Sequence, residues 1–217
     1  MKKILFIVFT LLISHITAFA NSIPEPGKTT VFPIYINNAK TAFDKDLEQK
    51  LVKSIEPELS KNYTIVKNDN YKEDFKKIGI EDLSKAERVD ILEVFKDKTD
   101  FVVILEIEPV INESSSSLLS KSVTSKGSLQ LKIVDIINKK YLVNERISYK
   151  DKDSQLSVSY LDLIDIKKKP ITMRNFEKIL KQASNKIVTT IPKTNTEKTI
   201  NDKTESSGNI LMPSKKN

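Results

Sequence analysis

The sequence predicts an α/β protein with one mixed β-sheet of about five strands, arranged along the chain as β-α-β-α-β-β-β-α with helices packed on the sheet. The main evidence is segment 100–110, in which residues 101 to 105 are all apolar. A run of this length without alternation is typical of a central strand that is covered on both faces. Helical patterns before it and an alternating hairpin pattern after it predict the rest of the sheet.

The first part of the chain is predicted to form a strand and a long helix. Residues 30–36 predict the strand, in which Pro33 must lie where no backbone donor is needed. Thr41 and Asp44 have the spacing of a capping box that starts the helix, and Pro57 is expected to end or kink it. One apolar stripe runs along the helix, formed by Phe43, Leu47, Leu51, Ile55 and Leu59.

A second strand and two shorter helices lead into the central strand. Residues 63–66 predict the strand, and apolar spacing over 71–78 predicts a short helix that stops at Gly79. Residues 84–87 match a second capping box, which starts a helix of about three turns. That helix is expected to deliver the chain to Asp100, where the central strand begins.

The pattern becomes polar beyond Pro109, which is expected to end the pairing of the central strand. The serine-rich segment 113–117 predicts a solvated loop that leads towards Gly127. Apolar residues alternate with polar ones over 129–137 and again over 141–149. This alternation predicts a β-hairpin with one face on the core.

A final helix closes the predicted domain, which covers residues 29–192. Segment 150–170 is compatible with several packings, so no element is predicted there. Thr172 is predicted to cap the last helix, whose apolar side contains Phe176, Leu180, Ala183 and Ile187. Residues 193–217 are polar and lack periodicity, which predicts a disordered tail.

The first twenty residues have the pattern of a secretory signal peptide. Two lysines precede an apolar run at 4–13, and the small-x-small pattern at 18–20 predicts cleavage after Ala20. This apolar run is too short for a membrane-spanning helix, which needs about 20 such residues. We therefore expect a signal peptide at 1–20, a flexible leader at 21–28, and export to the periplasm or the extracellular space.

The composition removes much of the usual chemistry of enzymes. The sequence has no cysteine and no tryptophan, and its one histidine, His15, lies in the expected signal peptide. Thiolate nucleophiles, imidazole bases and the usual zinc and copper ligands are therefore missing from the expected mature chain. Without cysteine, the chain is also expected to form no disulfide and to carry no lipid anchor on an N-terminal cysteine.

The charge distribution argues against binding to nucleic acid. The formal net charge is +7, or +5 once the two lysines of the signal peptide are removed. Only three of the 36 basic residues are arginine, and the lysines are interleaved with acidic residues, as on a solvated surface. At most a weak contact with an anionic surface is expected, for example at residues 167–169 before Pro170.

Weak candidates for a metal site are Glu106 and Glu108, which lie two residues apart on the central strand and so share a face. They could form a cation site or an acid pair, or they could mark a strand end that meets solvent or a lysine. No third ligand or proton-transfer partner is identifiable. Residues 151–153 begin like a calcium loop but lack its glycine and its final glutamate, which favours a solvated turn. No catalytic residue and no cofactor are predicted.

Residues 30–190 resemble a group of bacterial envelope domains that includes the N-terminal domain of TolB and the globular part of the curli-secretion lipoprotein CsgG. The resemblance is carried by the opening strand 31–34 before Asn37 and Asn38, by the long first helix, and by the helix that runs into 100–103. The later hairpin and the closing helix also fit. Thr99 departs from the small residue often found before the aspartate, and no β-propeller repeat follows. The resemblance implies contacts between proteins in the envelope.

Two classes of function are compatible with these observations. The first is an exported, non-enzymatic envelope protein that acts as a protein-binding or assembly accessory module, with envelope proteins as partners. Its expected contact surfaces are an exposed sheet edge and the loops around Ser114 to Ser128. The alternative is a carboxylate-based metal-dependent or hydrolytic enzyme of the cell envelope. A pocket lined by convergent carboxylates would favour the enzyme, whereas a filled core with a flat or grooved surface would favour the binding module.

Overall fold

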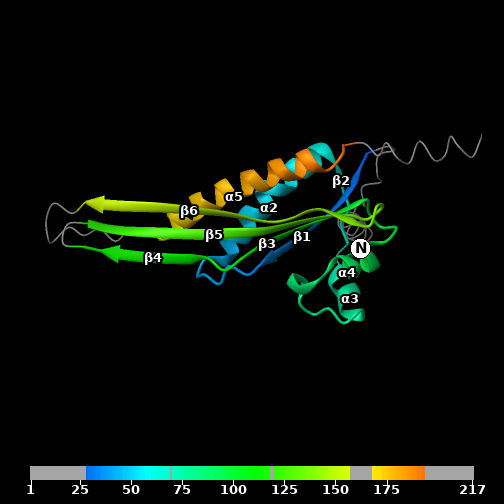
Figure 1. The fold of residues 1–217 in the computed structure, drawn as a ribbon, viewed down its shortest axis with the longest axis horizontal. Helices are drawn as coiled ribbons and strands as arrows, with labels where there is room; N and C mark the ends of the chain where they lie inside the picture. The colour runs from blue at the N-terminus through cyan, green and yellow to red at the C-terminus, as the bar shows by residue number, and fades with distance from the viewer. Residues whose placement is uncertain (1–27, 69, 118–119, 157–167, 194–217) are drawn as a thin grey trace, which may run out of the picture.

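The computed structural model describes residues 28–68, 70–117, 120–156 and 168–193 (Figure 1). The predicted signal peptide and leader therefore lie outside the described residues, apart from Lys28, as does the predicted tail, apart from Lys193. The elements in chain order are β1 (Thr30–Asn37), α2 (Asp44–Asn62), β2 (Thr64–Ile65), α3 (Tyr71–Lys77), η1 (Leu83–Lys85), α4 (Arg88–Phe95), β3 (Phe101–Ile107), β4 (Ile111–Ser116), β5 (Ser120–Asp135), β6 (Lys140–Leu156) and α5 (Lys168–Thr190). This arrangement confirms the predicted α/β class with one mixed sheet.

The sheet is organised around β3 and the long strand β5. Its strand order is β2-β1-β3-β5-β4, and β6 pairs with the other side of β5. β1 runs parallel to β2 and β3, while β5 is antiparallel to β3, β4 and β6. β3 pairs with residues 129–135 of β5 and β4 pairs with residues 121–126. β3 and β4 therefore lie end to end along one side of β5, with Pro109 between them.

The central strand is buried on both faces, as its unbroken apolar run predicts. Phe101, Val103 and Leu105 belong to the core on the side of α2 and α5. Val102 and Ile104 belong to the second core, which contains residues of α3 and α4. Helices therefore cover this part of the sheet on both sides.

We call the part of the sheet that helices cover, together with those helices, the body. Beyond the body, three strands project as a ribbon (Figure 1). We call β4 together with residues 120–126 of β5 and 150–156 of β6 the ribbon. Figure 1 shows α2 and α5 along one side of the sheet, and α3 and α4 at the end away from the ribbon. No helix in the described ranges is both long enough and apolar enough to cross a membrane.

The predicted loop at 113–117 is wrong, because residues 111–116 form strand β4, which pairs in register with β5 from Ile111↔Lys126 to Ser116↔Lys121. The strand is exposed along almost its whole length. A strand that meets water on both sides has no apolar alternation, so its sequence looks like that of a loop.

Two predicted features of the helices are also wrong. α2 does not end at Pro57 but continues to Asn62, because Ile55 and Leu59 on either side of the proline are both buried against the sheet; the alternative of a kink at Pro57 stays a prediction. The final helix starts at Lys168 rather than after Thr172, whose side chain is completely buried. Because Thr172 lies inside the helix and is buried, it contributes to packing and cannot act as the N-terminal cap.

The two predicted capping boxes are each displaced. At the first, Asp44 is already helical and its Oδ1 accepts bonds from the backbone N–H and the hydroxyl of Thr41, both at 2.6 Å. At the second, residues 83–85 form the 3₁₀ turn η1. The reciprocal box lies three residues later, where Glu87 and Asp90 start α4. In both places the sequence motif marks the region in which a helix begins but not the first helical residue.

Candidate protein-interaction surface

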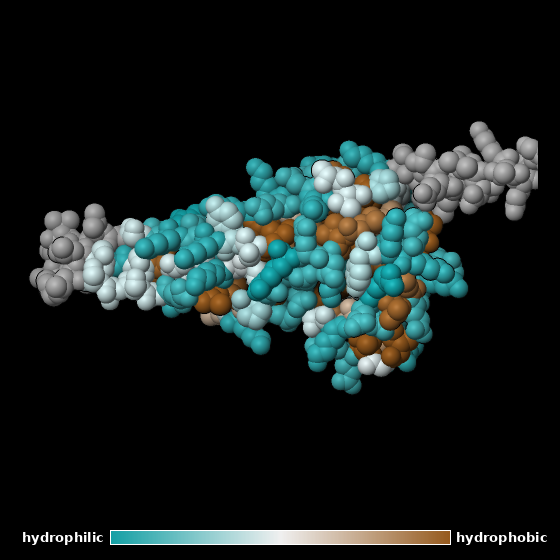
Figure 2. Space-filling view, viewed as in Figure 1, coloured by the Kyte–Doolittle hydropathy of each residue, from teal (hydrophilic) through white to brown (hydrophobic). Residues whose placement is uncertain are grey.

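The sheet has one face that helices cover only in part. Residues of β5 and β6 alternate between the side that packs on α5 and the opposite side, which we call the open face. The open face carries the even-numbered residues 122–132 of β5 and 144–154 of β6, together with residues 111, 113 and 115 of β4. On this face η1 and α4 reach only the end of β5 near Lys132, whose Nζ donates to the backbone oxygen of Ser84 at 3.4 Å. The remainder has no covering helix, and its residues are half-buried or exposed apart from Ser128; the ribbon is mostly teal and white in Figure 2.

Glu106 and Glu108 lie on the open face, and each has its own partner. Glu106 accepts a hydrogen bond from Asn38 Nδ2 at 2.9 Å. Glu108 accepts a hydrogen bond from the Ser128 hydroxyl and forms an ion pair with Arg146 Nε at 2.5 Å. Within the part of the chain that the structure describes, no group of three or more His, Cys, Asp or Glu side chains could hold a metal ion. The two glutamates thus contact neighbouring side chains rather than converge on one site.

A groove crosses the open face next to the break between β3 and β4. Its volume is about 460 Å³, and it is lined by Pro109 and Ile111, by Lys126 of β5, and by Arg146, Ser148 and Lys150 of β6. Ile111 is 54% exposed although it is a large apolar residue. The groove therefore combines an apolar end with several cations.

The cations of the groove lie close together because of the strand register. Lys126 and Lys150 are directly opposite each other on β5 and β6. Like charges at such positions destabilise a sheet. Glu113 of β4 offsets part of this repulsion, since its Oε1 lies 2.6 Å from Lys126 Nζ. The hydrogen bond from Lys126, with the charges of Lys126 and Lys150, lowers the pKa of the exposed Glu113 carboxyl.

The opposite side of β6 is acidic, and α5 neutralises it. Asp151 Oδ2 lies 3.2 Å from Arg174 Nε and 3.9 Å from Lys178 Nζ, and Glu145 Oε2 lies 3.2 Å from Lys186 Nζ. The predicted solvated turn at 151–153 is therefore a strand segment whose two aspartates face α5. β6 thus has acidic residues on its α5 side and basic residues on its open face. This separation was missed from the sequence because no strand was predicted beyond residue 149, so the alternation of acidic and basic residues over 150–153 was not assigned to two faces.

Two strands of the ribbon have one side without a strand partner. Among the described residues, β6 pairs only with β5 over its whole length, and β4 likewise pairs only with β5. Unpaired strand edges expose backbone N–H and C=O groups, which a further strand can bind. Among the described residues, the ribbon therefore has an unpaired strand edge on each side, as was expected of the sheet from the sequence.

A buried polar joint fastens the base of the ribbon to α5. The Thr172 hydroxyl lies 3.1 Å from Ser125 Oγ and 3.1 Å from Asn112 Oδ1. Asn175 Nδ2 donates to the backbone oxygen of Ser125 at 2.9 Å. Next to this joint, α5 approaches β5 so closely that a Cβ on Gly127 would lie 3.1 Å from the ring of Phe176. α5 therefore fixes the position of the strands that carry the groove.

Comparison with known proteins gives similarity in structure alone. No protein-family model and no curated protein sequence matches the chain. Lipoprotein GNA1162 from Neisseria meningitidis is similar at 15% identity, with a TM-score of 0.39 over 72% of this chain and 99% of that one. The C-terminal domain of LpoB from Escherichia coli is similar at 8% identity, with a TM-score of 0.36 over 64% and 93%.

The structure of TolB, which the sequence was predicted to resemble, has a lower TM-score than the two structures above. TolB from Acinetobacter baumannii is 12% identical, with a TM-score of 0.27 over 74% of this chain and 29% of that one. These TM-scores are all below 0.5, so the matches assign neither an activity nor a partner to the chain. The resemblance to CsgG stays a prediction. The expected lack of a lipid anchor also stays a prediction.

Proposed function

We propose that this chain is an exported, non-enzymatic protein of the bacterial cell envelope that binds another protein and acts as an assembly accessory. The observation that carries the proposal is the ribbon, whose open face and two strand edges no other described element covers. Within the ribbon, strand β4 adds little to the core, since it is almost fully exposed. Exposed strand edges and a grooved face are the features by which sheet proteins bind partner chains.

The proposed location rests on the N-terminal sequence. Two lysines, the apolar run at 4–13 and the pattern at 18–20 support export with cleavage after Ala20. Intact-mass measurement of protein from the native host should show a chain that begins at Asn21. Recovery of chains that retain Met1 in a membrane fraction would contradict the proposed cleavage.

The proposed lack of enzymatic activity rests on side-chain chemistry. The expected mature chain has neither histidine, the commonest general base, nor cysteine, one of the usual nucleophiles of covalent catalysis. Glu106 and Glu108 are the two carboxylates on which the alternative enzyme would depend. Glu106 contacts Asn38 and Glu108 contacts Arg146, so the two carboxylates do not form a pair. These contacts support the binding module over the carboxylate-based enzyme.

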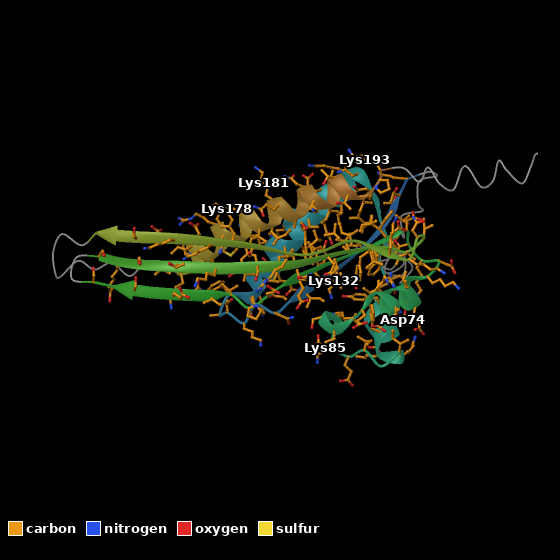
Figure 3. All side chains as sticks on the ribbon, viewed as in Figure 1. Asp74, Lys85, Lys132, Lys178, Lys181 and Lys193 are labelled. Atoms are coloured by element: carbon orange, nitrogen blue, oxygen red, sulfur yellow. The ribbon has the colours of Figure 1, made fainter. Side chains whose placement is uncertain are left out.

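Site-specific photo-crosslinking in the native host tests whether the ribbon binds a protein. A photoreactive residue would replace Ser115 on β4 or Ser148 on β6, both on the open face. Matched control positions are Lys85 on η1 and Lys181 on α5, which Figure 3 shows at opposite sides of the body. We expect one and the same envelope protein in the adducts from both ribbon positions and from neither control. Capture of that protein from Lys85 or Lys181 and not from the ribbon would contradict the proposal.

A further inference from the structure

We propose that the outer edge of β6 binds an extended acidic segment of the partner protein, which adds to the sheet as a further strand with carboxylates on the open face. This inference rests on the proposed function, because it names the chemistry of the partner that the ribbon binds. Three observations on β6 carry it: the unpaired edge, the separation of charge between its two sides, and the opposition of two lysines across the groove.

The first observation is the length of the edge. β6 comprises 17 residues, Lys140–Leu156, and among the described residues its only strand partner is β5. An added strand would bind the outward N–H and C=O groups of β6 through backbone hydrogen bonds, whatever its side chains are. The side chains of β6 then decide which sequences are accepted.

The second observation is the charge on each side of this edge. On the α5 side, the carboxylates of Glu145, Asp151 and Asp153 already pair with cations of α5. On the open face, Arg146, Lys150 and Lys152 are exposed, and neither of the two lysines forms an ion pair within the described structure. Over residues 145–153, a strand added to β6 would therefore meet unneutralised positive charge on the open face and neutralised charge on the α5 side.

The third observation is the repulsion between Lys126 and Lys150, which face each other across β5 and β6. Glu113 is the only carboxylate of the described residues that forms an ion pair with either lysine. A carboxylate on an added strand, opposite Lys150, would relieve this repulsion. Same-face residues of a strand recur every second position, so alternating acidic residues match the spacing of 146, 150 and 152 on β6.

The same charges disfavour a second copy of this chain as the occupant. Antiparallel pairing of two β6 edges about a two-fold axis keeps each face of the sheet continuous, so that residues of one face meet each other. With Ser148 at the centre, Arg146 would stand opposite Lys150 of the other copy, and Glu145 opposite Asp151. Like charges would meet on both faces, whereas an acidic partner strand places opposite charges on the open face.

The test uses the full mature chain and synthetic peptides. The probe is an eight-residue peptide with capped ends in which valine and aspartate alternate. One control replaces aspartate with lysine, and a second keeps the aspartates but carries a methyl group on every other backbone nitrogen, which blocks strand pairing. Binding is measured by fluorescence anisotropy, and hydrogen–deuterium exchange locates it. We expect binding of the first peptide alone, weaker in high salt, with slower exchange in 140–156 and unchanged exchange in 111–116.

Matched variants test the named cations. The variant Arg146→Gln, Lys150→Gln, Lys152→Gln should bind the alternating valine–aspartate peptide about tenfold more weakly, since each exposed ion pair contributes several-fold at most. The control variant Lys72→Gln, Lys76→Gln, Lys96→Gln removes the same charge from exposed positions on and next to α3 and α4 and should bind as the wild type does. Should the first variant fail to fold, the methylated peptide still decides the question on the wild-type chain.

Several results would overturn the inference. They are equal binding of the methylated or the lysine peptide, protection of β4 in place of β6, a β6-mediated dimer, or binding to vesicles of anionic phospholipid through the same three cations without any peptide binding. Capture of a partner at Ser148 combined with no binding of the acidic peptide would overturn the acidic strand and leave the proposed function standing. Failure of both would remove the two proposals together.

Discussion

Replacement of Thr172 by valine is a direct test of how the ribbon is held. The side chains have nearly the same shape, but valine lacks the hydroxyl that lies between Ser125 Oγ and Asn112 Oδ1. Each lost hydrogen bond costs about 0.5–1.5 kcal/mol, and the completely buried Ser125 is left with a hydroxyl that has no partner. The added methyl group returns at most about 1 kcal/mol. Thr172→Val should therefore lower the free energy of unfolding by about 1–3 kcal/mol.

The assay is thermal and urea unfolding of the purified mature chain. For a chain of this size, a loss of about 2 kcal/mol corresponds to a fall in Tm of about 4–8 °C. Thr189→Val is the matched control, because Thr189 is exposed on the same helix and should change stability by at most about 0.5 kcal/mol. The double variant Ser125→Ala, Thr172→Val should lose less than the sum of the single losses, since both partners of one bond are removed. A Thr172→Val protein as stable as the wild type would refute the buried joint.

Three further predictions concern the body of the protein. Val103→Asp places an unpaired charge at a completely buried position of β3, and we expect no cooperative unfolding transition by circular dichroism. Gly127→Val should cost about 1–3 kcal/mol in urea unfolding, because even a Cβ lies 3.1 Å from the Phe176 ring; an unchanged midpoint would contradict the close approach of α5. Burial of the Tyr35 phenol, with the charge of Glu56, raises its pKa far above the usual 10, so its stabilising contribution is complete below pH 10 and is lost as the pH rises further. Tyr35→Phe should make the fall in stability above pH 10 shallower, as measured by urea unfolding at several pH values.

The core elements could be predicted because their residues are buried. The apolar run of β3 and the four-residue spacing of Leu47, Leu51, Ile55 and Leu59 on α2 both reflect contacts in the core. The hairpin of β5 and β6 was predicted from alternation at residues that face α5, such as Leu129 and Ile147. In each case the pattern in the sequence is a direct consequence of which face leaves water.

β4 could not be predicted in the same way, because what makes it a strand lies elsewhere in the chain. Its serines face solvent and show no alternation, and it is a strand because its backbone pairs with residues 121–126 of β5. Thr172 raised a related difficulty. A threonine before an apolar helical pattern is a normal cap, and only its contact with Ser125, distant in sequence, shows that it is buried inside the helix.

The cationic groove depended on strand register, which the sequence does not determine. Along β6, basic and acidic residues alternate, and a shift of one residue would exchange the two faces. The register shifts by one residue between the pairs Ile133↔Val143 and Val134↔Tyr141, where Leu142 of β6 has no partner on β5. Only the register on the ribbon side of this irregularity places Lys126 opposite Lys150. A prediction from alternation could therefore find the hairpin but not the juxtaposition of the two lysines.

The two sides of β5 near residue 126 have complementary roles. On one side, Ser125 and Gly127 contact α5 and hold the strand in place. On the other side, Lys126 extends into the groove opposite Lys150, a position that opposes pairing of β5 with β6. The buried contacts with α5 stabilise a strand pair that its own open face destabilises. A ribbon held in this way keeps a concentration of positive charge fixed at an open sheet edge, where an acidic strand would find both its backbone and its charge partners already in position.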